Sequence, residues 1–353
     1  MDLNDFNAFN QHDPQNMLAE IDNLPAQLEK AWKLGQSQPL AEMTGIRQVI
    51  IPGMGGSAIG ADLLAAYITP SCPIPVIVHR DYGLPAWAHG PETLVIASSH
   101  SGDTEETLDS FSEALHKKCK LMAVATGGQL AEHAMQAKIP LWKFEHAGQP
   151  RAAVGFSFGL LLAIFARLGL IPGPAKELAG AVEAMKKQQE SLRADVPVSQ
   201  NPAKRLAGQL VGRWVNVYGS GCLAPVARRW KSQINEIAKA GAGFEVLPEA
   251  DHNALAGLIN PADFLSRTAT LFLSAPSDHP RNHLRGELTR QGFMNEGLNT
   301  DVYEAQDGSP LASIWTTLHF GDYTAYYLAM AYGVDPTPVE VLENFKVAMK
   351  AVR

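Results

Sequence analysis

The chain has 353 residues, of which 46% are hydrophobic and 18% are charged, and its formal net charge is −7. At about 100–200 residues per domain, this length predicts two domains with well-developed cores. A mildly acidic chain argues against nonspecific nucleic-acid binding as the main role. The net charge is still compatible with a local basic pocket for a small anion.

The three cysteines, Cys72, Cys119 and Cys222, are scattered without a CxxC spacing. This usage is typical of a reducing compartment, and we expect the three to be buried apolar side chains. The acidic, polar start MDLNDFNAFNQHD lacks the basic and apolar parts of a signal peptide. The longest apolar stretch, between Arg151 and Arg167, is shorter than the roughly 20 residues of a membrane span and predicts a buried helix. We therefore expect a soluble, cytoplasmic protein.

Apolar residues at helical spacing, from Met17 to Trp32, predict a leading amphipathic helix over residues 13–35. Short β-rich runs then alternate with longer helical patterns. These runs are RQVIIPG, PIPVIVHRD, ETLVIASSH, KLMAVAT and a weaker IPLWKF. Near-continuous apolar strands that alternate with helices are the signature of a doubly wound parallel sheet.

A charged, Gln-rich helical stretch at residues 176–202 ends in Pro, Ser and Asn residues that resemble a linker. Four further strands are predicted beyond it, from RWVNVYGSG, GFEVLPEAD, ATLFLSAPS and NTDVYEA. The strand-to-glycine turns at Gly53 and Gly219 are 166 residues apart, and the strands that begin near Thr93 and Thr268 are 175 apart. These similar offsets predict an internal repeat.

The predicted fold class is therefore α/β with two subdomains, residues 1–185 and 186–353. We expect each subdomain to be a doubly wound, mainly parallel sheet flanked by helices.

The segment VIIPGMGGSAIGADLL places a glycine-rich turn between a strand and a helix. Glycines let the backbone approach a ligand closely, and the helix start offers unpaired N–H groups to an anion. A dinucleotide site is an alternative, since G-x-G-x-x-A runs from Gly53 to Ala58. The next strand ends at Arg80 instead of an acidic residue, and Asp81 lies slightly late, which weakens this alternative. A purely structural role in packing also stays open.

The strand-to-helix turn in IASSHSGDTEETL carries four hydroxyls, on Ser98, Ser99, Ser101 and Thr104. Hydroxyls and backbone N–H groups at a helix start can hold a phosphate monoester without a metal. The turn lacks the Walker lysine pattern, which argues against a nucleoside triphosphate. Helix capping by Asp103 or Thr104 is the alternative, but it does not require four hydroxyls. The matching LSAPSDHPRN turn has lost most of them, so we expect one half alone to hold the phosphate.

These segments resemble the sugar-isomerase (SIS) fold. With GSGCLAPVARRWKSQINEIAKAGAGFEVLPEADHNALAG, ATGGQLAEHA, PRAAVGFSFG and DPTPVEVLENFK, the chain resembles the bifunctional phosphoglucose/phosphomannose isomerase family from about Ile46 onward. The resemblance implies an enzyme that interconverts glucose 6-phosphate, and also mannose 6-phosphate, with fructose 6-phosphate through a cis-enediol. It implies no cofactor.

The resemblance implies three catalytic residues. Glu236 matches the family's base, and its mostly apolar helix would raise its pKa toward working pH, whereas a lone helical carboxylate is usually a solvated one. His252 matches the acid–base residue that opens the sugar ring, a role suited to the intrinsic pKa of histidine. Lys346 matches a lysine that assists ring opening, with Lys350 one turn further on as its competitor.

The resemblance also implies the substrate-binding residues. Arg151 would stabilise negative charge on the phosphate or the enediolate, and Thr337 is a candidate for a threonine that helps the family accept both C2 epimers. The implied assembly is a homodimer with shared active sites, in which His252 reaches the site of the other subunit. The implied phosphate contacts are Gly56, Ser57, Ser99, Ser101 and Thr104.

Two other classes are alternatives: a noncatalytic phosphosugar-binding module and another SIS isomerase or aminotransferase. A regulator usually carries a helix-turn-helix part, which the acidic chain with its single leading helix does not supply. An aminotransferase needs an ammonia-releasing domain, commonly with an N-terminal cysteine, whereas this chain begins Met-Asp-Leu. His279 and His283 stand four apart, but Pro280 follows the first and no HExxH is present, so we expect no metal site. We also expect no nucleic-acid or membrane partner.

Overall fold

The computed structural model describes residues 2–305 and 308–351. All nine strands predicted from the β-rich runs are confirmed, and every strand pairing is parallel. The first sheet has the order β2-β1-β3-β4-β5 and the second has the order β7-β6-β8-β9. The strands are β1 (Gln48–Pro52), β2 (Val76–His79), β3 (Thr93–Ser99), β4 (Lys120–Ala125), β5 (Leu141–Lys143), β6 (Trp214–Ser220), β7 (Ala242–Leu247), β8 (Thr268–Ser274) and β9 (Asn299–Glu304).

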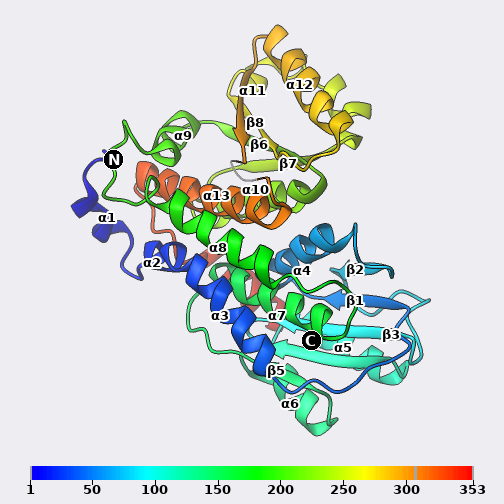
Figure 1. Ribbon diagram of the computed structural model, residues 1–353. Coiled ribbons are helices and arrows are strands. Elements are labelled where there is room, and N and C mark those ends of the chain that lie inside the picture. The colour runs from blue at the N-terminus through cyan, green and yellow to red at the C-terminus, as the bar shows by residue number, and fades with distance from the viewer. Residues whose placement is uncertain (1, 306–307, 352–353) are drawn as a thin grey trace.

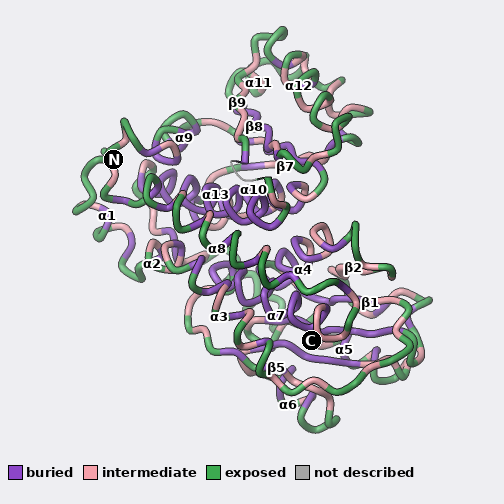
Figure 2. The backbone as a smooth tube through the Cα atoms, viewed as in Figure 1, coloured by how far each residue is buried: buried purple, intermediate pink, exposed green. Residues whose placement is uncertain are grey.

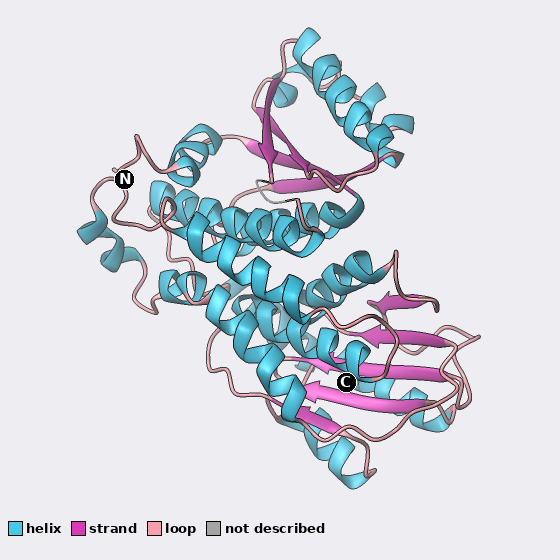
Figure 3. Ribbon diagram, in the orientation of Figure 1, coloured by secondary structure: helices cyan, strands magenta, loops and turns pink. Residues whose placement is uncertain are grey.

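Helices connect consecutive strands along the chain except between β2 and β3, and Figure 3 shows helices packed around both sheets. The α-helices are α1 (Phe6–His12), α2 (Met17–Asp22), α3 (Leu24–Ser37), α4 (Gly55–Ile68), α5 (Glu105–His116), α6 (Gly128–Gln136), α7 (Val154–Arg167), α8 (Ala175–Gln189), α9 (Pro202–Leu210), α10 (Ala224–Glu236), α11 (Ala262–Leu265), α12 (Pro280–Asn295), α13 (Pro310–Tyr332) and α14 (Glu340–Ala351). The 3₁₀ turns are η1 (Pro150–Ala153), η2 (Gly221–Leu223), η3 (Glu249–His252) and η4 (Ala254–Ala256).

The predicted internal repeat is visible in the topology of the two sheets. In each sheet the first strand of the unit lies between the second and the third, and the fourth follows the third. Gly55 and Gly221, 166 residues apart, have nearly equal positive φ angles of 49° and 50° at the start of the first crossover. The same glycine turn is therefore built twice.

A layer of helices separates the two sheets (Figure 1). Helices α4, α7 and α3 lie over the first sheet, and α10 and α13 lie under the second, whereas α5 and α6 cover the outer face of the first sheet and α12 that of the second. Side chains alternate accordingly along β1: Val49 and Ile51 join the core of the helical layer, and Ile50 joins the smaller core beneath α5. Figure 2 shows the buried backbone concentrated in this layer and in the central strands.

The long apolar stretch between Arg151 and Arg167 forms η1 and α7, as predicted for a buried helix. Residues Pro150–Arg167 are the single segment of the described chain that is long and apolar enough to cross a membrane, and 83% of that window is buried inside the structure. Gly155 and Gly159 bring α7 close to α3, because a Cβ at either position would press on α3. The apolar composition of α7 is thus explained by packing.

The prediction of a single leading helix over residues 13–35 is wrong. The segment forms α2 and α3, which meet at Asn23, and α1 precedes them. Pro25 cannot donate a backbone hydrogen bond and stands in the first turn of α3, so a new helix starts there. Asp13 lies outside both helices and accepts hydrogen bonds from the N–H groups of Met17 and Leu18. Short polar side chains at helix starts decide these breaks.

The cysteines are free, as expected, but none is fully buried. Cys72, Cys119 and Cys222 each keep part of their surface exposed while they pack against the edges of the cores.

A buried ion pair connects α10 to α13. The Arg229 side chain donates from Nε to Asp322 Oδ1 at 3.2 Å and from Nη2 to Oδ2 at 2.9 Å. Both side chains are at most 3% exposed. Removal of one partner leaves an uncompensated charge in the core, which costs more than the pair itself contributes.

We expect Asp322→Ala to lower the free energy of unfolding by about 3–5 kcal/mol, because Arg229 would remain buried without its partner. Urea unfolding followed by tryptophan fluorescence measures this change. Replacing both residues, as Arg229→Met with Asp322→Leu, should recover at least half of the loss. Glu183→Ala, which removes an exposed ion pair with Lys186, is the matched control and should change stability by less than about 1 kcal/mol. Equal effects of the two single variants would contradict the prediction.

Candidate active site

The hydroxyl-rich turn lies where β3 ends, next to the glycine turn at the end of β1. Ser99 Oγ is buried, accepts the Gly102 N–H at 3.0 Å and lies 2.9 Å from Thr104 Oγ1. The Ser57 hydroxyl accepts the N–H of His100 at 3.1 Å, which ties the two turns together. After β1 and β3 the chain turns toward opposite sides of the sheet. In open parallel sheets, ligands usually bind at the carboxyl ends of two neighbouring strands whose connections diverge in this way.

Helix capping does not account for the hydroxyls of this turn. Thr104 is the N-cap residue of α5, but its side chain makes no capping hydrogen bond. Asp103 instead accepts the N–H of Gln129 at 3.0 Å and so ties the turn to the start of α6. Ser101 is exposed, and its Oγ accepts the Asp103 N–H at 3.2 Å. The Ser101 hydroxyl proton therefore remains for a ligand, and the Thr104 proton does so when Ser99 is the donor in the hydrogen bond between their hydroxyls.

Gly56 lets η1 lie directly on the start of α4. A Cβ at this position would clash with the Pro150 carbonyl oxygen and would lie 3.4 Å from Arg151 Cα. The absent side chain thus brings Arg151 beside the glycine turn, although the two are 95 residues apart in the chain.

Arg151 is 5% exposed and connects three segments of the chain. Its Nη2 donates to the carbonyl oxygens of Pro336, at 2.9 Å, and Thr337. Its Nη1 lies 3.8 Å from Glu236 Oε2. Burial lowers the pKa of Arg151, and the charge of Glu236 opposes this shift. Its Nε is buried without a hydrogen-bond partner among the described residues, which leaves one donor for a ligand oxygen.

Glu236 is the last residue of α10, and its side chain is 30% exposed. Lys239 follows it just after the helix and donates from Nζ to the Glu236 carbonyl oxygen at 2.6 Å. Removal from water lowers the pKa of Lys239 to about 8, and the charge of Arg151 adds to the shift, whereas Asp335 and Glu236 oppose it. Two cations and two carboxylates therefore lie close together here. We call this group of Arg151, Lys239, Glu236 and Asp335 the junction.

Sequence reasoning missed Lys239 and Asp335 as members of the junction. Lys239 could have been found from its spacing, because it lies three residues after Glu236 in NEIAK. Asp335 approaches through the segment after α13, which no local pattern connects to α10. Thr337 does reach the junction: it is buried, and its hydroxyl has no hydrogen-bond partner among the residues that the structure describes.

His252 and Lys346 are not brought to the junction within one chain. His252 ends η3 beyond β7 and is exposed. Lys346 lies on α14, whose described residues are all exposed. Neither makes a hydrogen bond or ion pair with Glu236 or Arg151 in the described part of the chain.

The second sheet has a different group at the equivalent edge. A small cavity of about 80 Å³ there is lined by Ser220, Ser274 and Asp278, among others. The Asp278 carboxylate accepts the Ala275 N–H at 3.0 Å and lies 3.3 Å from where a Cβ on Gly221 would be. A carboxylate beside the second glycine turn repels a phosphate dianion.

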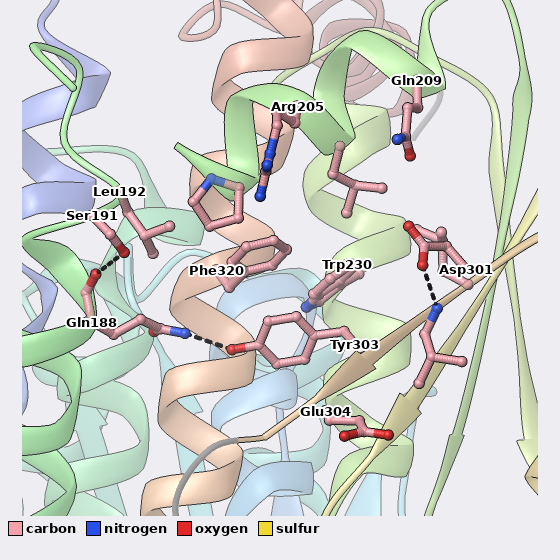
Figure 4. Close-up of a pocket in the computed structure, with 14 residues that line it drawn as sticks. Gln188, Ser191, Leu192, Arg205, Gln209, Trp230, Asp301, Tyr303, Glu304 and Phe320 are labelled. Atoms are coloured by element: carbon pink, nitrogen blue, oxygen red, sulfur yellow. Dashed lines mark hydrogen bonds between the residues drawn. The ribbon is translucent and has the colours of Figure 1, made fainter. Parts of the chain in front are cut away.

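A larger cavity, of about 420 Å³, lies between α8, α9, α13 and β9 (Figure 4). The rings of Tyr303, Phe320 and Trp230 form one wall, and Arg205 of α9 and the carboxylates of Asp301 and Glu304 on β9 also line the cavity. None of the predicted site residues lines it, and its mixed charges select no single ligand charge. No cluster of three or more potential metal ligands occurs in residues 2–305 and 308–351.

Two parallel sheets separated by helices, with a hydroxyl-rich turn at a strand crossover, define the SIS class of phosphosugar folds. Residues 199–349 match the bacterial phospho-glucose isomerase C-terminal SIS domain. A solved hypothetical protein of Thermus thermophilus has the same fold, with a TM-score of 0.73 and 17% identity over 97% of this chain and 91% of that one.

Two curated relatives identify the family within this class of folds. The chain is 38% identical to the bifunctional phosphoglucose/phosphomannose isomerase of Caldicellulosiruptor bescii, over 96% of this chain and all of that protein. It is 31% identical to the protein of the same name from Aquifex aeolicus, over 88% of this chain and 92% of that one. The chain therefore belongs to the bifunctional phosphoglucose/phosphomannose isomerase family.

We expect Lys239 to react with a limiting amine-acylating reagent with a midpoint near pH 8, because burial and the Arg151 charge disfavour its ammonium form. Mass spectrometry of the labelled peptides, with the exposed Lys187 as internal comparison, measures the midpoint. In Arg151→Met the midpoint should rise, since one repelling charge is gone. An unchanged midpoint in that variant would show that the two cations do not interact.

Proposed function

We propose that this chain is an aldose–ketose isomerase that interconverts glucose 6-phosphate, and also mannose 6-phosphate, with fructose 6-phosphate through a cis-enediol. The observation that carries the proposal is the junction of Arg151 with Glu236 beside the two crossover turns. It combines a phosphate-binding arrangement with a carboxylate and a buried cation, which are the groups that proton transfer next to a carbonyl requires.

In this proposal the sugar phosphate binds at the edge of the first sheet. Its phosphate accepts hydrogen bonds from the hydroxyls of Ser101 and Thr104 and from the backbone at Gly56, while Ser57 and Ser99 hold the two turns in place. These donors suit a dianion and need no metal.

The chemistry then uses Glu236 as the base. His252, assisted by Lys346, opens the ring by moving a proton between the ring oxygen and the anomeric hydroxyl. The Glu236 carboxylate takes the C2 proton of the aldose, the carbonyl oxygen at C1 gains a proton, and the cis-enediol forms. Glu236 returns its proton to C1 as the C2 hydroxyl loses one, which yields the ketose. Arg151 stabilises the negative charge that develops on the oxygens, and Thr337 is the proposed threonine that accommodates both epimers.

A homodimer completes the proposed site. His252 is exposed and makes no hydrogen bond or ion pair with Glu236 in the described part of its own chain, so we propose that it acts in the active site of the partner subunit. Helix α14, which carries Lys346, exposes a row of apolar side chains that packing against a second copy would cover. These side chains are Val341, Leu342, Phe345 and Met349, which helical spacing places on one side of α14.

The two parts of the chain have different roles in this proposal. Residues 1–185 hold the phosphate turn, residues 186–353 supply Glu236, His252 and Lys346, and α8 (Ala175–Gln189) runs across the boundary between the two parts. A cytoplasmic location follows from the substrates, which are intracellular phosphosugars in this proposal.

The test is a coupled assay with purified protein and fructose 6-phosphate that follows glucose 6-phosphate and mannose 6-phosphate separately. Glu236→Gln should lower kcat by about three orders of magnitude with KM changed less than about threefold, because the amide fills the same space but accepts no proton. Glu245→Gln, a partly buried carboxylate on β7, is the matched control and should keep wild-type turnover. Tight phosphosugar binding without turnover in the wild type would instead favour a noncatalytic binding module.

Shared active sites predict complementation between two inactive variants. Glu236→Gln and His252→Ala subunits, each inactive alone, should regain about a quarter of wild-type activity when refolded together in equal amounts. Half of the dimers are then hybrids, and each hybrid has one intact site. The measurement is specific activity after mixing, with mixed Glu236→Gln and Glu236→Ala subunits as the control. No recovery, with hybrid dimers shown by mass spectrometry, would place both residues in the same subunit's site.

A further inference from the structure

Three side chains form a hydrogen-bonded row that ends in the proposed phosphate turn. Glu20 Oε2 on α2 lies 3.2 Å from His146 Nε2, and His146 Nδ1 lies 2.9 Å from His100 Nε2. His100 stands between Ser99 and Ser101, and its backbone N–H binds Ser57 Oγ. The row therefore runs from the outer N-terminal helices to the centre of the turn.

The surroundings of the row are apolar toward His100 and open toward Glu20. The His100 ring packs edge-on against Phe144, and the His146 ring packs edge-on against Phe156. The His146 side chain is 8% exposed and that of Glu20 is 30% exposed. Lys30 of α3 lies on the same side, with its Nζ 5.8 Å from the centre of the Phe156 ring. Asp103, in the same turn as His100, is engaged by Gln129.

The donor and acceptor capacities of the three side chains determine which nitrogen atoms carry protons. An ionised carboxylate only accepts, so His146 donates from Nε2 to Glu20, and its Nδ1 is then the acceptor when the ring is neutral. His100 must donate from Nε2, which leaves Nδ1 with an unprotonated lone pair on the side of the ring nearest its own backbone. Burial, together with the neighbouring His146 ring, lowers the pKa of His100 to about 4, so this ring is neutral at physiological pH. Nδ1 has no hydrogen-bond partner among the described residues.

We propose that Glu20, His146 and His100 form a proton relay that couples binding of the sugar phosphate to uptake of one proton. A proton arrives at His100 Nδ1, the shared proton moves from His100 Nε2 to His146 Nδ1, and the positive charge rests on His146 beside the Glu20 carboxylate. His100 Nδ1 thereby changes from an acceptor into a donor toward the bound phosphate. These three are positioning residues, and this inference rests on the proposed phosphate turn.

The direction of the pH dependence follows from linkage. The complex binds one proton more than the free protein and the free ligand together, so affinity for the phosphate falls as pH rises. The fall reaches at most about tenfold per pH unit while a single proton is taken up. A phosphate turn built only from hydroxyls and backbone N–H groups would show no such fall above the phosphate's own ionisation, near pH 6.

Calorimetric titration with 6-phosphogluconate, a phosphosugar acid without a carbonyl to isomerise, tests the relay. Titrations at pH 7.5 in buffers of different ionisation enthalpy give the number of protons taken up. We expect about one proton in the wild type and close to none in Glu20→Gln, with affinity about tenfold weaker in the variant. The glutamine keeps an oxygen that accepts from His146 but cannot stabilise its positive charge. Glu29→Gln, an exposed carboxylate paired with Lys33 on α3, is the control and should match the wild type.

A second measurement reads the protons directly. Nitrogen-15 imidazole spectra of the free protein at pH 8 should show His100 protonated at Nε2, and addition of 6-phosphogluconate should move the proton signal to Nδ1. Equal proton uptake in the wild type and Glu20→Gln, or Nδ1 protonated in the free protein, would overturn the relay. Proton uptake without isomerase turnover would leave the relay standing and overturn the proposed enzyme. Normal turnover with uptake unaffected by Glu20→Gln would overturn the relay alone.

Discussion

The contact between Gly56 and the Pro150 carbonyl is the constraint on which the rest of the site depends. It sets η1 against the start of α4, so that Arg151 lies beside the crossover turns of the first sheet. The Arg151 guanidinium then reaches two carbonyl oxygens after α13 and the carboxylate at the end of α10. A side chain at Gly56 would push these segments apart, because its Cβ would clash with the backbone of Pro150, which no change of side-chain rotamer can relieve.

Much of the fold follows from the sequence because both sheets are parallel and covered on two faces. The strands β1, β3, β4 and β8 are almost continuously buried runs with turn residues at their ends, whereas β9 at the edge of the second sheet (NTDVYE) is largely polar. The leading helices are harder to predict, because their breaks depend on single residues such as Pro25 and Asp13, which a hydrophobic periodicity averages over. Local capping decides where helices begin, and hydrophobic spacing only decides which face is buried.

The candidate site also has a part that can be predicted from local sequence and a part that cannot. The hydroxyl turn is contiguous in sequence and could be predicted from its composition. Contacts such as that between Arg151 and Thr337 join residues 186 positions apart and arise only when η1 and the segment after α13 meet. The family resemblance named Arg151 and Glu236 without their geometry, and it missed Lys239, whose lowered pKa depends on burial at the junction. Side chains that matter only after tertiary packing leave no local pattern.

The duplicated fold carries a hydroxyl-rich edge in one of its two units. Both units build the same glycine turn, with Gly55 and Gly221 in nearly the same left-handed conformation. In the first unit the neighbouring turn supplies hydroxyls, whereas in the second the Asp278 carboxylate accepts the Ala275 N–H and lies near Gly221. Burial raises the pKa of Asp278, which is the expected cost of placing an acid at this position. The first crossover helix of the second unit, α10, ends in Glu236, 3.8 Å from Arg151, so the second unit contributes a carboxylate to the site instead of a second hydroxyl-rich turn.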